Sequence, residues 1–159
     1  YLVTNQNDKK AMGGMLRRAK TILRTNDFTA LYDKGYHTGS EFSTADELGI
    51  ETLVAIPNTS SRTPHTDYEL SAFSFCESDD SYTCPQGHIL KSNGSWYTTR
   101  NYRFKQYKTS ACKSCPLRYL CTSSKANGRT LQRSEHQVAI EANSARISAS
   151  GDLYKNARQ

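Results

Sequence analysis

Five cysteines carry the clearest chemical signal in this sequence, and three of them crowd into one short segment. Cys112 and Cys115 are separated by two residues, a spacing that presents two thiolates to one tetrahedral ion. The other candidate ligands are Cys84, Cys121 and, as a substitute for one cysteine, His88. An odd number of cysteines without a secretory signal favours metal binding over a disulfide framework. We therefore expect structural Zn²⁺, with buried or free thiols as the alternative and Cys76 as a packed thiol.

Asp33 is the second candidate, because it follows a short apolar run that predicts a buried strand over 28–33. Ligands of α/β proteins bind at the carboxyl ends of parallel strands. A carboxylate at that point can hold Mg²⁺ if further carboxylates arrive from neighbouring elements. Alternatively, Asp33 caps its own turn, with Gly35 at positive φ. The residues alone leave both interpretations open.

A basic and aromatic run is the third feature, and it lies in the more basic half of the chain. Residues 1–90 hold 8 Lys/Arg against 12 Asp/Glu, whereas residues 91–159 hold 13 against 3. This asymmetry indicates an anionic polymer such as DNA as partner, unless the charges only solvate the surface. The residues that we expect to contact phosphates are Arg100, Arg103, Lys105 and Lys108.

The alternation of side-chain types within this run predicts a strand with two different faces. Tyr102 and Phe104 would form an aromatic face, and Arg103 and Lys105 a basic one. We expect the aromatic face to belong to the core, and Trp96 to be a core residue as well.

The order of predicted elements gives an α/β fold. Helices are expected over 9–24, capped by Asp8, and from Ser40 to Gly49, and strands over 28–33 and 51–56. Helix, strand, helix and strand with short connections form a parallel β-α-β unit. The expected inward side chains of the first helix are Met15, Leu16, Ala19, Ile22 and Leu23.

The second half of the chain has a different pattern. Polar residues predict a linker over 58–70, and short strands with turn signals predict a cysteine-rich β insertion of two hairpins over 71–133. A capping box at Ser134–Gln137 predicts a helix over about 135–149, with Val138, Ala142 and Ala145 inward. Residues 1–57 and 134–159 would then form one core, interrupted by the insertion.

Bulk properties are those of a soluble protein. Hydrophobic content is 36% and mean hydropathy is −0.74. No run approaches the roughly 18 apolar residues of a membrane span, and no signal peptide precedes the first helix. We expect a cytoplasmic protein without membrane contact. Because the sequence begins at Tyr1 rather than Met and stops at Gln159 within a helix-like stretch, we also expect an internal fragment.

Several motifs, in the same order along the chain, resemble DDE transposases of bacterial insertion sequences. Residues 28–39, with Asp33, resemble their second-aspartate motif, and residues 3–8 and the helix that follows resemble the segment before it. Residues 82–87, 112–116 and Cys121 resemble the cysteine-rich insertion of one such group of mobile elements.

This resemblance implies a partial RNase H-like domain in which three carboxylates bind two ions, Mg²⁺ or Mn²⁺. It implies DNA cleavage and strand transfer during transposition and recombination, by a nucleoid-associated homo-oligomer acting on transposon ends and target DNA. Asp33 is the only ligand that carries over. The first aspartate would lie upstream of Tyr1, and the glutamate beyond Gln159. Tyr154 and Arg158 resemble the motif before that glutamate, with a spacing one residue longer than the common form.

Two other functions are compatible with the same residues. A non-enzymatic zinc-ribbon module that binds nucleic acid would need neither Asp33 nor other carboxylates. An inactive transposase remnant would lack the flanking aspartate and glutamate. The coding sequence on either side of residues 1–159 discriminates among all three.

Overall fold

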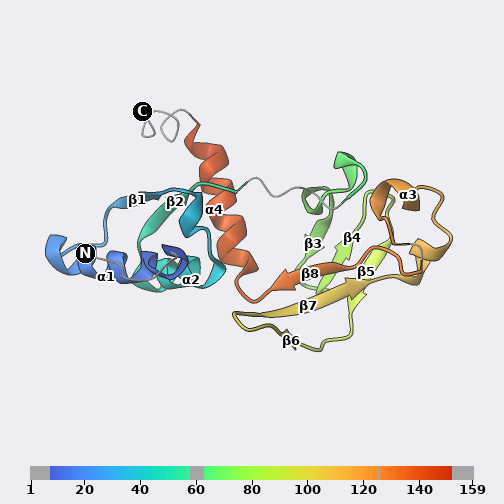
Figure 1. Cartoon of the computed structure of the whole chain (residues 1–159), viewed down its shortest axis with the longest axis horizontal. Helices are drawn as coiled ribbons and strands as arrows, with labels where there is room; N and C mark the ends of the chain where they lie inside the picture. The colour runs from blue at the N-terminus through green and yellow to red at the C-terminus, as the bar shows by residue number, and fades with distance from the viewer. Residues whose placement is uncertain (1–7, 58–62, 125, 152–159) are drawn as a thin grey trace. The chain divides into compact units, whose positions relative to one another are not determined.

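The chain was analysed as a computed structural model that describes residues 8–57, 63–124 and 126–151. It divides into two compact units (Figure 1). Unit 1 contains Tyr1–Asn58 and His136–Gln159, and unit 2 contains Thr59–Glu135. Each unit mixes helices or short turns with a β-sheet, so the expected combination of α and β structure is confirmed at that level. No helix in the described part of the chain is both long and apolar enough to cross a membrane.

Unit 1 is built on two parallel strands joined by a helix. Its elements are α1 (Met12–Leu23), β1 (Thr29–Tyr32), α2 (Gly39–Leu48), β2 (Glu51–Val54) and α4 (Gln137–Ser150). Thr29 pairs with Glu51 and Tyr32 with Val54, in parallel register. This is the β-α-β unit that the sequence predicted. Gly49 ends α2 at φ 66° and donates its N–H to carbonyls of the last turn, because a left-handed residue there costs glycine nothing.

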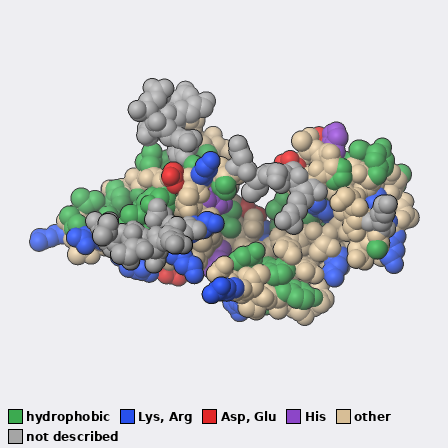
Figure 2. Space-filling model, viewed as in Figure 1, with side chains coloured by type: hydrophobic (Ala, Val, Ile, Leu, Met, Phe, Trp, Pro, Cys, Tyr) green, Lys and Arg blue, Asp and Glu red, His purple; other side chains and the backbone are tan. Residues whose placement is uncertain are grey.

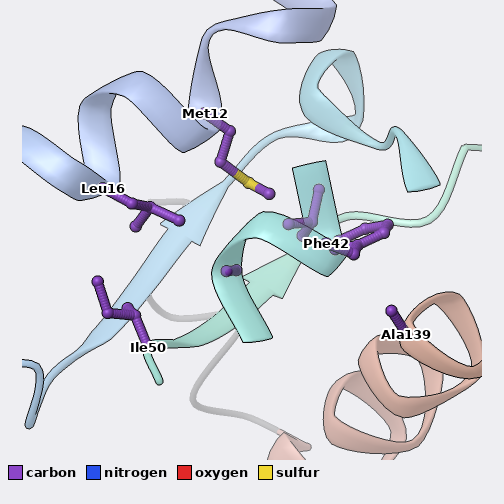
Figure 3. Packing of buried hydrophobic residues seen from close by; sticks show 7 residues of the cluster. Met12, Leu16, Phe42, Ile50 and Ala139 are labelled. Carbon is purple, nitrogen blue, oxygen red and sulfur yellow. The ribbon is translucent and has the colours of Figure 1, made fainter. Parts of the chain in front are cut away.

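Apolar side chains from all three helices form the core of unit 1 (Figure 3). Met12 and Leu16 of α1 pack against Phe42 of α2, and Ile50 and Ala139 complete the cluster. A Cβ on Gly13 would lie 2.8 Å from Thr44 Cγ2, so this glycine permits close approach of α1 to α2. The Gly13 N–H also donates to Glu41 Oε2 at 2.6 Å. The glycine that weakens α1 by propensity is therefore required by its packing.

The expected ends and faces of α1 and α2 are partly wrong. Ala11 precedes α1, so Asp8 is not its cap, and Thr38 rather than Ser40 precedes α2. Ile22 and Leu23 are 67% and 56% exposed. The buried stripe starts earlier, at Met12, and the last turn of α1 extends beyond the residues that cover it.

The prediction for α4 was correct in position and wrong in its cap and face. Ser134 belongs to strand β8 and cannot cap the helix, which follows His136 instead. Val138 is 67% exposed, whereas Ala139 and Asn143 are buried. Small side chains lie on several sides of this helix, so composition alone did not identify its inner face.

Asn143 explains which side of α4 turns inward. Its side-chain amide donates to the Val54 carbonyl and accepts from the Val54 N–H, both at 2.9 Å. One turn further, Arg146 Nε donates to the Thr52 carbonyl at 3.0 Å. These contacts satisfy the edge of β2 that does not face β1, where another strand would otherwise be needed. Figure 1 shows α4 running beside β2.

Replacing Asn143 with Leu is expected to lower the free energy of unfolding by about 2–4 kcal/mol, because it leaves the Val54 N–H and C=O buried and unpaired. Urea unfolding followed by circular dichroism measures this loss. Ser148→Ala, an exposed change on the same helix, should cost less than about 0.5 kcal/mol. A similarly small loss for Asn143→Leu would mean that water replaces both hydrogen bonds.

Unit 2 is an antiparallel sheet with short helical turns at Thr66–Tyr68, Leu70–Ala72 and Ser110–Lys113. Its strands are β3 (Ser74–Cys76), β4 (Ser81–Thr83), β5 (Ile89–Ser92), β6 (Tyr97–Thr98), β7 (Arg103–Lys108) and β8 (Leu131–Ser134). The order is β3-β4-β5-β7-β6, with β8 on the other edge of β7. Helix α3 (Arg118–Cys121) lies at one end of this sheet (Figure 1). The hairpins β3–β4, β4–β5 and β6–β7 exceed the two that we expected.

The core of unit 2 lies on one face of this sheet and includes Phe73, Tyr82, Leu90, Tyr107 and Leu131. Since side chains alternate along a strand, Arg103 and Lys105 of β7 point to the same face as Tyr107. The expectation that Phe104 and its neighbour Tyr102 form the core face is therefore wrong. Trp96 is also 46% exposed and not a core residue.

Candidate functional site

Asp33 directly follows β1, at the carboxyl end of a parallel strand. Its side chain is exposed, and Oδ1 accepts the N–H of Gly35 at 2.7 Å. Asp33 therefore caps its own turn, as one interpretation expected, and it also lies at a strand end where α/β proteins bind ligands. Gly35 does not have the positive φ that we expected. A Cβ on Gly35 would lie 2.9 Å from Asp33 Oδ1, so a larger residue there would displace the carboxylate from this position.

Asp33 does not belong to a metal-holding group within the described residues. Side chains of His, Cys, Asp and Glu within 8–57, 63–124 and 126–151 form no group of three that could hold a metal ion as they are placed. The buried carboxylate of unit 1, Glu41, is already bonded to the N–H of Gly13. Asp33 is thus a single carboxylate with one oxygen engaged by its own turn.

Four of the five cysteines of unit 2 line one small cavity between the sheet and α3. The candidate ligands that line this cavity are Cys84, Cys112, Cys115, Cys121 and His88. Its volume is about 20 Å³, enough for a single water-sized guest. All the residues that the sequence assigned to zinc therefore line a common space, although they come from two separate segments, 84–88 and 112–121.

The turn at Cys84 has the geometry of a ligand-presenting knuckle. The Gly87 N–H donates to the Cys84 carbonyl at 2.8 Å, and Gly87 lies at φ 79°. The next N–H, that of His88, points at Cys84 Sγ over 3.3 Å. A backbone N–H directed at sulfur stabilises a thiolate, which is the form of cysteine that binds metal.

The loop opposite this turn is closely packed. A Cβ on Gly128 would lie 2.1 Å from the Cβ of Cys112, so only glycine fits there. Arg118 and Arg129 also line the cavity and supply positive charge beside the sulfurs. Burial raises the pKa of the Cys121 thiol, and the nearby Arg129 opposes that rise.

These observations meet one requirement for a zinc site and leave another unmet. The donor types and their convergence fit a structural Zn²⁺. A bound ion would further require four donors at about 2.0–2.3 Å from one point, and the side chains as placed do not form such a group.

Two of the four expected DNA contacts are engaged inside unit 2. Arg103 makes a two-pronged ion pair with Glu135 Oε2, at 2.9 Å from Nε and 2.8 Å from the terminal nitrogen. Lys105 Nζ lies 2.5 Å from Asp80 Oδ2. For Arg100 and Lys108 no ion pair or side-chain hydrogen bond is found within the described residues, and both are exposed.

Asp80 binds two side chains of β7 that point to the core face of the sheet. Besides Lys105, it accepts the hydroxyl of Tyr107 at 2.6 Å, and these two hydrogen bonds lower the pKa of Asp80. Burial, followed by this same bond, raises the pKa of Tyr107. Lys105, which the sequence assigned to a phosphate contact, is therefore paired with a carboxylate within unit 2.

Asp80→Asn is expected to destabilise unit 2 by about 1 kcal/mol at pH 7, a value kept small because Asp80 is partly exposed. A lowered carboxyl pKa adds stability above its unfolded value near 4, and this is lost as pH falls through the folded pKa. Wild-type stability should therefore fall more steeply on acidification than that of the variant. Asn tolerates the φ of 44° found at this position.

Urea unfolding between pH 7 and pH 3 measures both quantities. Asp79→Asn, the same change at the exposed neighbouring residue, should leave the pH dependence as in the wild type. Equal pH slopes for Asp80→Asn and the wild type would contradict a stabilising role of the Asp80 carboxylate.

Comparison with known proteins assigns a family to the second half of the chain. Residues 83–159 match the family model described as the transposase DDE domain. This match confirms the resemblance to DDE transposases. No curated protein and no solved structure gives a significant match.

The DDE domain match covers the four cysteines that line the cavity and strand β7, all in unit 2, and helix α4 in unit 1. It implies a role in DNA transposition, with DNA as the substrate and divalent metal ions as typical cofactors of the family. Asp33 lies upstream of the matched residues. Tyr154 and Arg158 lie within them but outside the residues that the structure describes.

Residues whose hydrogen-bond partners are distant in the sequence are not evident from the sequence. No sequence pattern distinguishes Asp80 or Asn143 from its neighbours. Their partners lie 27 and 89 positions away, so no local pattern identified them.

Proposed function

We propose that this chain contributes to DNA strand cleavage and transfer by a DDE transposase, with Asp33 as a ligand of the catalytic divalent ions. One observation carries the proposal: an exposed carboxylate ends β1 of a parallel β-α-β unit in a chain whose second half matches the transposase DDE domain. The parallel strands and the helix between them are compatible with a partial RNase H-like domain.

The chemistry requires more than Asp33. In such sites, paired divalent ions activate an attacking oxygen and stabilise the leaving oxygen of a phosphodiester. Mg²⁺ dehydrates reluctantly and usually needs several oxygen ligands, including substrate phosphates. The role of Asp33 is to present Oδ2 to such an ion while Oδ1 stays bonded to Gly35. The resemblance assigns the other two carboxylates to positions upstream of Tyr1 and beyond Gln159.

Strand cleavage in Mg²⁺ or Mn²⁺ tests the proposal, with full-length protein that contains this chain compared with its Asp33→Asn variant. Loss of cleavage with normal folding is the expected result. Cleavage at the wild-type rate would remove Asp33 from the active site.

Structural zinc is the second part of the proposal. Cys84, Cys112, Cys115 and Cys121 would be its ligands, with His88 able to replace one of them. Support comes from their convergence on one cavity and from the His88 N–H directed at Cys84 Sγ. Zinc would supply cross-links between the β4–β5 turn and the loop around α3, which contain little core of their own.

DNA contact is proposed for the basic residues 91–159, with Arg100 and Lys108 as the stronger candidates among the four residues that the sequence predicted. Arg103 and Lys105 already have carboxylate partners, so they could contact phosphates only by sharing or exchanging them.

A non-enzymatic zinc-ribbon module that binds nucleic acid is the alternative. This module would not need Asp33 as a metal ligand, and within the described residues Asp33 belongs to no group of three side chains that could hold a metal ion. Flanking codons without the expected aspartate and glutamate would favour this module or an inactive remnant.

A further inference from the structure

The sheet of unit 2 has an outer face, opposite its core, that carries a distinct set of side chains. Strand register assigns these residues to it, because they alternate with the buried ones: Lys91, Tyr97, Phe104, Gln106, Lys108 and Gln132. Tyr102, just before β7, continues the alternation. None of these side chains is acidic. Figure 2 shows hydrophobic side chains, in a class that includes Tyr, gathered near β6 with Lys or Arg beside them.

Two lysines stand side by side at one end of the outer face. Lys91 and Lys108 are directly opposite each other across β5 and β7, and both are exposed. Neither has an ion pair or side-chain hydrogen bond within the described residues. Like charges at directly opposed positions destabilise a sheet. An anion bound between them would remove that repulsion.

Aromatic rings occupy the other end of the same face. Tyr97 is stacked on Phe104, with ring centroids 5.7 Å apart and an interplanar angle of 27°. Tyr102 lies 6.2 Å from the same ring. Tyr97 and Tyr102 are still 36% and 41% exposed, so part of each ring is available. Phe104 and Lys108 are four positions apart on β7, or roughly 13 Å.

We propose that the outer face binds single-stranded DNA, with bases stacked on Tyr97 and Tyr102 and phosphates at Lys91 and Lys108. Unpaired bases expose the π faces that aromatic rings bind, whereas duplex bases are already stacked on each other. A partner protein with a purely apolar surface would leave the two lysines uncompensated. The inference rests on DNA as the substrate and names its form; it involves neither Asp33 nor a bound metal.

The test measures binding of the chain to a fluorescent oligo-dT and to a duplex of equal length, by anisotropy in buffer without Mg²⁺. Oligo-dT should bind more tightly. Tyr97→Leu and Tyr102→Leu should each weaken that binding about 5- to 150-fold, with little effect on the duplex. Tyr→Phe at either position keeps the ring and should preserve binding.

The lysines are tested by salt dependence. Lys91→Gln with Lys108→Gln should reduce the slope of log affinity against log salt by about 1.4 for single strands. Arg17→Gln with Arg18→Gln, which removes two exposed charges from α1, is the matched control and should leave the slope unchanged.

Equal affinity for both DNA forms, or unchanged oligo-dT binding by folded Tyr→Leu variants, would overturn the proposal. So would self-association of the wild type in sedimentation that Tyr97→Leu abolishes, because a second copy would then cover this face. Asp33→Asn should bind oligo-dT like the wild type. Wild-type cleavage by Asp33→Asn would overturn the role of Asp33 alone, whereas unchanged oligo-dT binding by the Tyr→Leu variants would overturn the single-strand proposal alone.

Discussion

Asp33→Asn is expected to reduce strand cleavage and joining by the full-length protein by at least about 100-fold, the scale on which enzymes lose rate when one charge-stabilising group is removed. The substitution removes one negative charge and nearly preserves shape. Asn can still accept the Gly35 N–H through its side-chain oxygen, so the turn after β1 should persist. Folding and DNA affinity should therefore change little.

The design of this experiment depends on a matched control. Asp27→Asn makes the same chemical change at an exposed aspartate shortly before β1 and should retain wild-type activity. Residues 1–159 alone should be inactive in Mg²⁺ and in Mn²⁺, because a lone carboxylate binds these ions weakly. Equal losses in the Asp27 and Asp33 variants would indicate a general charge effect and not a metal ligand.

The β-α-β unit was predictable because its signals are local. The sequence contains a β-rich run that ends at Asp33, an amphipathic helix that ends at Gly49 and a second β-rich run. This order of elements predicts a parallel β-α-β unit. Periodicity and a glycine at the end of a helix depend on residues a few positions apart. The convergence of the cysteines was also predictable, since Cys112 and Cys115 form a local pair and Cys84 lies in a recognisable turn.

The inner faces of β7 and α4 were not predictable in this way. In β7, aromatic residues occur on both faces, and Tyr107 rather than Phe104 is buried because Asp80 neutralises Lys105 beside it. In α4, the polar Asn143 is buried because the free edge of β2 needs hydrogen bonds. From the polarity of the sequence alone, a polar residue is expected to face solvent. Its burial becomes evident only when its partner in the tertiary structure is known.

The same distinction bears on the DNA contacts. Arg103 and Lys105 attracted attention because they interrupt an aromatic run, and both have carboxylate partners. Lys91 was not noted, although its position opposite Lys108 makes it a stronger candidate. Pairing across strands, which the sequence does not reveal, decides which cations remain available for a phosphate.

Zinc removal is expected to unfold the end of unit 2 that contains α3. Structural zinc in small modules binds with apparent free energies of about 10–16 kcal/mol, which is more than most small domains have in reserve. The segments that meet at the cavity have few buried apolar residues, and α3 itself is a single turn. Protein purified without added metal should therefore contain about one equivalent of zinc, and chelation should lower both its helical signal and its resistance to protease.

Cysteine variants make this test specific. Cys112→Ser should reduce the zinc content well below one equivalent, whereas Cys76→Ser, a half-buried thiol away from the cavity, should leave it unchanged. Because metal displaces thiol protons, Cys84, Cys112, Cys115 and Cys121 should be protected from alkylation until zinc is removed, and Cys76 should react throughout. Less than about half an equivalent of zinc in the wild type, with all five thiols freely titratable, would show that the cavity is held by packing alone.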